Sequence, residues 1–324
     1  MNTRVEQPRA RPVATAVVAV ACGALAACGP DEDLAAPPQV DEATINALFE
    51  GKLVSALEPR ELITAEAGDL ITVEGLDLEV PQAGETLTVS STYTDQPART
   101  IVLSNDPGGR VVLSRTRFVP PAEPPPQERT IMAISQCSDS YHYFQGYQPG
   151  DVGWYYNGSA APSLIAGSGK LGAIKRGASN ITGVRNSCGI PDHMNRGQHY
   201  LGKTGRNASL RDHVNVVSWG WQPDGVLAVT YYWRNSANII SEADIRFSNR
   251  EFWGVGISGC SNDRFGGWYD LESMATHEWG HVWGLGDVYG ATHKNLTMYG
   301  YAKVCSKKKR TLGKGESHGL NTVY

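Results

Sequence analysis

The spacing of apolar residues changes character along the chain. Apolar residues recur at helical spacing in 41–57, and they form short β-type runs in 70–119. Turns rich in Gly and Asp, such as 106–109, separate these runs. We therefore expect a small β-rich N-terminal module in residues 41–119.

The remaining sequence, residues 130–324, carries both kinds of pattern. Ala161–Val184 and Leu271–Gly284 contain helical spacing, whereas Leu227–Trp233 has the composition of a strand and Ala243–Phe247 alternates in polarity. Every Trp of the chain lies in this part, and large aromatic side chains dominate the burial of a core. Strands mixed with a few helices predict an α+β domain.

The start of the chain has the layout of a signal peptide. Arginines come first, and an apolar stretch too short to span a membrane follows as far as residue 27. Its end, Leu25-Ala26-Ala27-Cys28-Gly29, resembles the bacterial lipobox, in which the Cys is lipidated and becomes the mature N-terminus. The alternative is a conventional cleavage site with Cys28 incidental. Either way we expect export, with the protein at the outer face of the bacterial cell membrane as a lipoprotein or extracellular.

Two segments have the composition of linkers. Residues 28–40 are rich in Pro, Ala and acidic residues and are expected to form a tether, and residues 120–129 form a Pro-rich linker. The predicted order is therefore a signal peptide (1–27), the tether, the β-rich module or propeptide (41–119), the linker, and the α+β domain (130–324).

His277 and His281 have the spacing of two metal ligands on one face of a helix. Side chains four positions apart lie one helical turn apart, so both imidazoles can reach one zinc ion. Glu278 lies next to His277 and can contact water at the metal. In this interpretation zinc acidifies water and polarises a carbonyl, and Glu278 is the general base.

Catalytic zinc needs a third protein ligand, and Asp287 is the candidate. Gly284 tolerates a positive φ, so it can end the helix and turn the chain back toward the metal. Asp287 follows this turn closely, whereas His293 comes six residues later and is not expected to bind. The alternative is an ordinary amphipathic helix with two satisfied His residues.

The run from His277 to Asp287, followed by Leu296-Thr297-Met298-Tyr299, resembles the extended zinc motif and Met-containing turn of metzincin peptidases. Upstream segments, among them Val216–Gly220 and Tyr269–Thr276, resemble matrixin-type catalytic domains, including bacterial secreted relatives. The resemblance covers about residues 130–324. Most matrixins have His as the third ligand, but snapalysin-type enzymes have Asp there, as in this chain.

The resemblance implies a metzincin catalytic domain with a twisted mixed sheet, a zinc-motif helix, a Met turn and a C-terminal helix. Met298 would be a structural floor beneath the ligands. Substrate would bind as an added strand along a sheet edge. By the same resemblance, that edge contains Val226, Leu227, Ala228 and Val229.

Cys22 and Cys28 belong to the leader, and four cysteines remain, an even number that favours disulfides in an exported chain. They allow three pairings, and the sequence does not choose among them; we expect Cys137–Cys188 and Cys260–Cys305. The segment that starts at Cys188 resembles the cysteine switch that caps zinc in latent matrixins. It lies inside the predicted catalytic region, so a disulfide is favoured over a zinc-capping thiol. Residues 29–129 contain no Cys, so inhibition by that segment would need different chemistry.

Two clusters of charge have an ordinary interpretation. The basic run Lys307–Arg310 is expected to be a solvated loop, with preference for acidic substrates or contact with anionic lipid as the alternatives. Matrixins bind calcium, and Glu242 and Asp244 could contribute ligands. The dense acidic cluster usual for that ion is missing, so Ca²⁺ is not predicted.

These observations predict a zinc-dependent endopeptidase that hydrolyses extracellular proteins or peptides with Glu278 as general base. The alternative is a cell-surface binding lipoprotein with a structural, non-catalytic zinc site, although such a site has no need of a base. The expected partners are a protein or peptide substrate and, through the lipid anchor, the membrane. With a net charge of −4 and no basic face, the chain is not expected to bind nucleic acid. We expect a monomer.

Overall fold

The computed structural model describes residues 56–57, 60–94, 98–118, 134–163, 165–166, 169–256 and 267–324. The predicted signal peptide, the lipidation site Cys28, the tether and the linker at 120–129 lie outside these residues and stay predictions. Among the helices of the described part, none combines the length and the apolar character that crossing a membrane requires.

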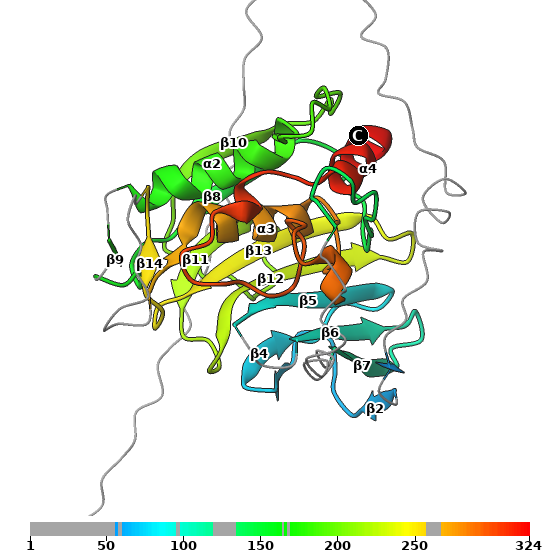
Figure 1. The fold of residues 1–324 in the computed structure, drawn as a ribbon. Helices are drawn as coiled ribbons and strands as arrows, with labels where there is room; N and C mark the ends of the chain where they lie inside the picture. The colour runs from blue at the N-terminus through cyan, green and yellow to red at the C-terminus, as the bar shows by residue number, and fades with distance from the viewer. Residues whose placement is uncertain are drawn as a thin grey trace, which may run out of the picture. The chain divides into compact units, whose positions relative to one another are not determined.

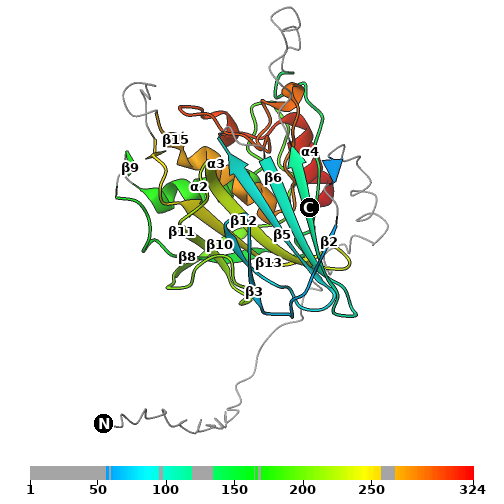
Figure 2. The same ribbon diagram turned by 90° about the horizontal axis from the view of Figure 1, so that it is seen from below.

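One mixed sheet has ten strands within the described residues. In order across the sheet they are β1 (Ala56–Leu57), β7 (Val111–Phe118), β6 (Ala98–Asn105), β5 (Glu85–Tyr93), β12 (Val226–Asn235), β13 (Ile240–Ser248), β11 (Asn215–Gly220), β8 (Val152–Tyr156) and β10 (Gln198–Lys203), and β2 (Glu61–Ile63) pairs with β7 outside this path. Neighbours from β13 to β10 are parallel, whereas β12 is antiparallel to both β13 and β5. Figure 1 shows β5, β6 and β7 continuing the sheet beyond β12, and Figure 2 shows β5 and β6 beside β12 from below.

Helices α2 (Lys170–Thr182) and α3 (Leu271–Val282) pack against each other on one face of this sheet (Figure 1). The described residues also form α4 (Lys314–Val323) and two single 3₁₀ turns, η2 (Ala291–His293) and η3 (Lys308–Arg310). The other strands are β3 (Leu70–Val73) and β4 (Leu76–Glu79), which pair with each other, and β9 (Ile165–Ala166), β14 (Trp253–Gly254) and β15 (Tyr269–Asp270). The predicted α+β class is confirmed.

Two apolar clusters lie on either side of β12. The helix-side core fills the space under α2 and α3 and includes Trp154, Trp279 and Tyr232. The strand-side core is formed by β3 to β7 together with β12, which contributes Tyr231 and Trp233. Strand β12 is therefore buried on both faces, which explains why its sequence is a nearly continuous apolar run rather than an alternating one.

The predicted edge strand is not at an edge. Val226–Val229 lie in β12, and β5 pairs with β12 from Val226 opposite Tyr93 to Asn235 opposite Glu85. The expectation came from a resemblance that covers only residues 130–324, so it could not include what residues 85–93 do. Instead of a module with a sheet of its own, strands β5 to β7 continue the sheet of the α+β domain and share a core with it.

The first predicted disulfide is confirmed, because Cys137 and Cys188 are bonded to each other. This bond leaves Cys188 no thiol with which to cap a metal, so the switch interpretation is wrong for this structure. Cys305 is also disulfide-bonded, and its predicted partner Cys260 lies outside the described residues.

Candidate metal centre

Helix α3 carries three of the candidate residues, and its two ends are well defined. At its start the Asp270 carboxylate accepts a hydrogen bond from the Ser273 amide at 2.8 Å, as an N-cap residue does. The Arg310 guanidinium in turn donates to both oxygens of Asp270, at 2.8 and 2.6 Å. At its end Gly284 has φ +80°, and a Cβ there would lie 1.9 Å from the Gly146 carbonyl oxygen, so only glycine fits. The predicted helix stop is confirmed.

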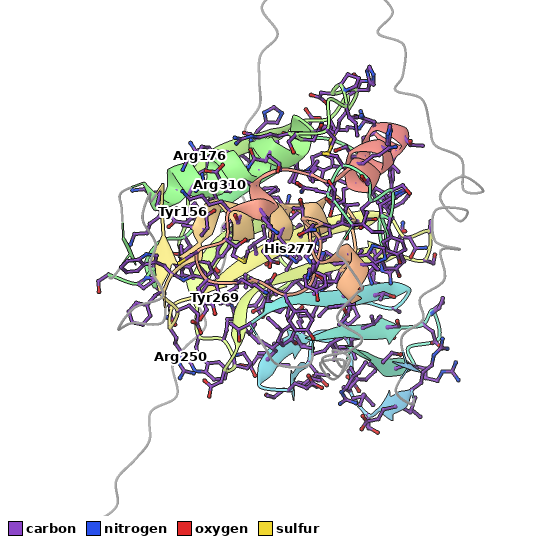
Figure 3. The ribbon with its side chains drawn as sticks, in the orientation of Figure 1. Tyr156, Arg176, Arg250, Tyr269, His277 and Arg310 are labelled. Atoms are coloured by element: carbon purple, nitrogen blue, oxygen red, sulfur yellow. A yellow bond between two sulfur atoms is a disulfide. The ribbon has the colours of Figure 1, made fainter. Side chains whose placement is uncertain are left out.

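A buried ion-pair cluster fixes this helix against its neighbours. Glu272 is almost fully buried and lies 2.7 Å from the Arg176 guanidinium of α2 and 3.6 Å from that of Arg310. Arg185 completes the cluster at 3.3 Å. Figure 3 shows Arg176 and Arg310 close together over α3, with His277 farther along the same helix. The helix is thereby held in place at the turn that precedes the candidate ligands.

The three predicted ligands lie together. Asp287 Oδ1 is 3.1 Å from His277 Nε2 and 3.4 Å from His281 Nε2, and the two Nε2 atoms are 3.2 Å apart. The other ring nitrogen of each His faces a backbone carbonyl at 2.8 Å, that of Thr297 for His277 and that of Leu285 for His281. When each Nδ1–H donates to its carbonyl, both Nε2 lone pairs point at the carboxylate.

This arrangement fits a metal cation. Lone pairs on two imidazoles and a carboxylate repel one another at such distances unless a positive charge lies between them. Both Asp287 oxygens are buried and no group of the described residues donates a hydrogen bond to them.

Burial, and then the positive charge of Lys309, lower the pKa of His277 to about 4, which keeps the imidazole in its metal-binding neutral form. Burial would raise the pKa of Asp287, but positive charge at the neighbouring imidazoles, that of His281 first, holds it well below its usual range, so the buried carboxylate depends on a cation beside it. These three residues could therefore hold a metal ion.

Glu278 lies beside the three ligands, but its carboxylate accepts hydrogen bonds from two threonines of the sheet. Thr92 Oγ1 of β5 donates to its Oε1, and Thr230 Oγ1 of β12 donates to its Oε2, both at 2.6 Å. Burial raises the pKa of Glu278 despite these hydrogen bonds. Neither threonine was predicted as a site residue. Thr230 lies in a predicted strand, and the alternation of side chains along a strand could have placed it on the sheet face that α3 covers. Nothing in the sequence around Thr92 indicates a role in the site.

Met298 lies directly beneath helix α3. A Cβ on Gly280 would come within 2.3 Å of Met298 Sδ, so the absence of a side chain at Gly280 lets the two segments touch. The buried Glu316 carboxylate fixes the turn, because it accepts hydrogen bonds from the amides of Met298 at 2.6 Å and Thr297 at 3.2 Å. It also accepts from the Gly313 amide at 2.6 Å, which ties α4 to the turn. Sequence reasoning missed this role of Glu316.

The basic run near the site is only partly solvated. Lys307 and Lys308 are exposed, as expected, but Lys309 is buried. Its ammonium group donates to the carbonyls of Thr297, at 2.9 Å, and Tyr299, and lies 3.0 Å from His277 Nδ1. Burial lowers the pKa of Lys309 to about 8. Four consecutive basic residues gave no indication that one of them supports the carbonyls beside the site.

Two further groups of candidates lie elsewhere. His293 Nδ1 is 2.8 Å from Asp139 Oδ2, away from the ligand cluster. The Glu242 carboxylate accepts hydrogen bonds from the Asp212 and His213 amides, at 3.0 and 2.7 Å. The Asp244 carboxylate likewise accepts from two backbone amides, so both carboxylates hold the loop before β11.

Comparison with known proteins gives no family. No model of a known protein family matches the chain, and no curated protein is significantly similar to it in sequence. The function must therefore be inferred from the residues of the site and their geometry.

Proposed function

We propose that the protein is a zinc-dependent endopeptidase whose zinc ion is held by His277, His281 and Asp287. The observation that carries the proposal is the convergence of two imidazole nitrogens and one carboxylate, with a carboxylate of a different role beside them on the same helix. Three protein ligands leave a fourth position open, as in catalytic zinc sites, whereas structural sites usually have four protein ligands.

The chemistry that zinc supplies in such a site is Lewis-acid polarisation of a carbonyl and acidification of water. Glu278 is placed to take the proton from water and pass it to the leaving amine. Its raised pKa makes this carboxylate a stronger base for taking the proton from water. Thr230 orients the carboxylate from the sheet, and Lys309 orients the carbonyl to which His277 donates. The resemblance to metzincins supports the same roles, with Met298 as the floor of the site.

A cavity beside the site supports a peptide substrate. It has a volume of about 550 Å³ and is lined by Met274, Leu296, Tyr299 and Lys309, with Thr94 at its wall. The lining of this cavity is largely apolar, and Lys294, Lys303 and Lys308 also contribute to it. We infer that it receives one side chain of a bound peptide. Export and lipidation at Cys28, as proposed from the sequence, would make the substrate extracellular.

The rival function is a binding lipoprotein whose zinc only stabilises the fold, and the burial of His277, Glu278 and His281 favours it. Cleavage of a fluorogenic peptide library by the zinc-loaded chain separates the two functions. The matched control is Glu278→Gln, which keeps the ligands, and the assay includes variants in which β5 is released from β12. Cleavage that needs both zinc and Glu278 is expected. If released, zinc-loaded protein leaves every peptide intact, the rival is correct.

A further inference from the structure

The candidate site is closed to solvent. His277, Glu278 and His281 are 0% exposed, and Asp287 is 7% exposed. A catalytic zinc ion needs an open position that substrate can reach. The structure must therefore open before it can act on a peptide. The element that covers Glu278 is the candidate for the part that moves.

Strand β5 covers the base and continues past it along the site. In addition to the pairing of β5 with β12, the Tyr93 amide donates to the Gly300 carbonyl at 3.1 Å, and the Ala302 amide donates to the Tyr93 carbonyl at 2.9 Å. The Thr94 amide donates to the Gly225 carbonyl at 3.0 Å. The main chain of Tyr93 thus lies between β12 and the segment after the Met turn. An extended peptide bound by strand addition is held through main-chain hydrogen bonds of this kind.

The two faces of β5 differ. Leu87 and Val89 belong to the strand-side core. The alternate residues Thr88, Ser90 and Thr92 carry hydroxyl groups and are 0% exposed. Thr92 donates to Glu278, so this hydroxyl face is turned toward the site. A strand that lines a permanent core would present apolar side chains there, whereas hydroxyl groups suit a strand face that water solvates once the strand has left the cleft.

We propose that residues 85–94 are an autoinhibitory strand that occupies the peptide-binding cleft and ties up the general base. The proposal rests on the proposed peptidase function. Thr92 and Thr230 hold one oxygen each of Glu278, so the carboxylate has a donor on both oxygens before water arrives. No cysteine takes part, because residues 29–129 contain none. The full chain is therefore latent, and it becomes competent when β5 separates from β12 and its end at Tyr93 separates from the segment 300–302.

Two variants of the full chain open the cleft. Tyr93→Pro removes the amide that donates to Gly300 and places a proline inside the sheet, and Tyr93→Phe is the control that keeps this amide. Val89→Asp is the second opener, in case the first does not fold, because it places a carboxylate at a position that is 1% exposed. Faster amide hydrogen exchange in β12 shows whether β5 has left.

Two engineered disulfides separate release of β5 from other effects. Ser91 lies opposite Val229 of β12, so Ser91→Cys with Val229→Cys pins β5 in the cleft. Thr86 lies opposite Ser104 of β6, with side-chain oxygens 3.2 Å apart, so Thr86→Cys with Ser104→Cys joins β5 to β6 and leaves β12 free. Each pair is added to the opened variant, and mass mapping checks the bond.

Each zinc-loaded protein is titrated with a fluorescent peptide hydroxamate, which needs an open cleft and bound zinc, and is assayed for peptide cleavage. We expect at least tenfold tighter probe binding by the opened variants than by the wild-type chain. The 91–229 disulfide should return binding to the wild-type level, and the 86–104 disulfide should not. Wild-type or 91–229-locked protein that binds and cleaves as well as the opened variants would overturn the proposal. So would opened protein with fast exchange in β12 and bound zinc that fails to bind the probe. Probe binding without cleavage would leave the covering role of β5 intact and refute the peptidase function instead.

Discussion

The role of Asp287 can be measured through the stability that zinc confers on the folded protein. Asp287→Asn keeps the size and shape of the side chain but removes its charge, and a neutral amide is a poor zinc ligand. Substitution of residues that only orient metal ligands costs roughly 10–100-fold in affinity. Loss of a ligand whose oxygen lies 3.1 and 3.4 Å from both imidazoles should cost at least about 100-fold.

That loss translates into a change in unfolding free energy. Zinc at about 100 times the wild-type Kd stabilises the folded state by ~2.7 kcal/mol. After a 100-fold loss the same zinc concentration equals the Kd of the variant and contributes only ~0.4 kcal/mol. For a domain of this size 1 kcal/mol shifts Tm by roughly 2–4 °C, so the zinc-induced rise in Tm should fall from about 5–11 °C to about 1–2 °C.

Scanning calorimetry with added zinc and with chelator measures both states. The metal-free baseline of each protein is measured separately, so that only the zinc-induced rise in Tm is compared. His293→Ala is the control, since His293 contacts Asp139 rather than the ligand cluster, and it should keep the full zinc effect. If Asp287→Asn keeps the zinc-induced rise in Tm and His293→Ala loses it, the ligand assignment is refuted.

Three further predictions concern carboxylates. Glu278→Gln in an opened variant should lower kcat/KM for peptides at least about 100-fold with unchanged zinc content by elemental analysis; equal turnover would exclude Glu278 as the base. Glu316→Gln should lower the free energy of unfolding by ~2–4 kcal/mol in urea titrations, because the new amide group cannot accept all three backbone hydrogen bonds; a loss under ~0.5 kcal/mol would contradict this role. Burial raises the pKa of Glu242 from 4.5 to about 7, so between these values the folded state keeps a proton that the unfolded state has released. Stability should therefore fall as pH rises through this window, by at most ~1.4 kcal/mol per pH unit, and Glu242→Gln should show a flatter dependence in thermal melts.

The ligands could be predicted from the sequence because their geometry is local. His277 and His281 share one face of a helix whatever the rest of the fold does, and the positive φ of Gly284 follows from its place after that helix. The same short segment carries Asp287, so the metal-binding group required no knowledge of distant contacts. Elements of the α+β class could be predicted for the same reason.

The partners of the site could not be predicted, because they come from distant parts of the chain. Thr92 is separated from Glu278 by 186 positions, and alternation identifies β5 as a strand without showing which strand it pairs with. The role of Glu316 could not be predicted, since nothing in its neighbours indicates that its carboxylate reaches the Met turn 18 positions away. Burial of Lys309 depends on tertiary packing, which the charge pattern does not contain.

The burial of the ligands has a consequence for how quickly metal enters and leaves. All three ligands lie within His277–Asp287, so they can capture zinc as soon as this segment folds, before β5 has docked. Once β5 is in place, exchange of the ion requires the cleft to open, and its rate is set by that opening rather than by the affinity of the ligands. Folding in the presence of zinc should therefore load the site quickly, whereas metal-free folded protein should take up zinc slowly and at a rate that does not rise with zinc concentration.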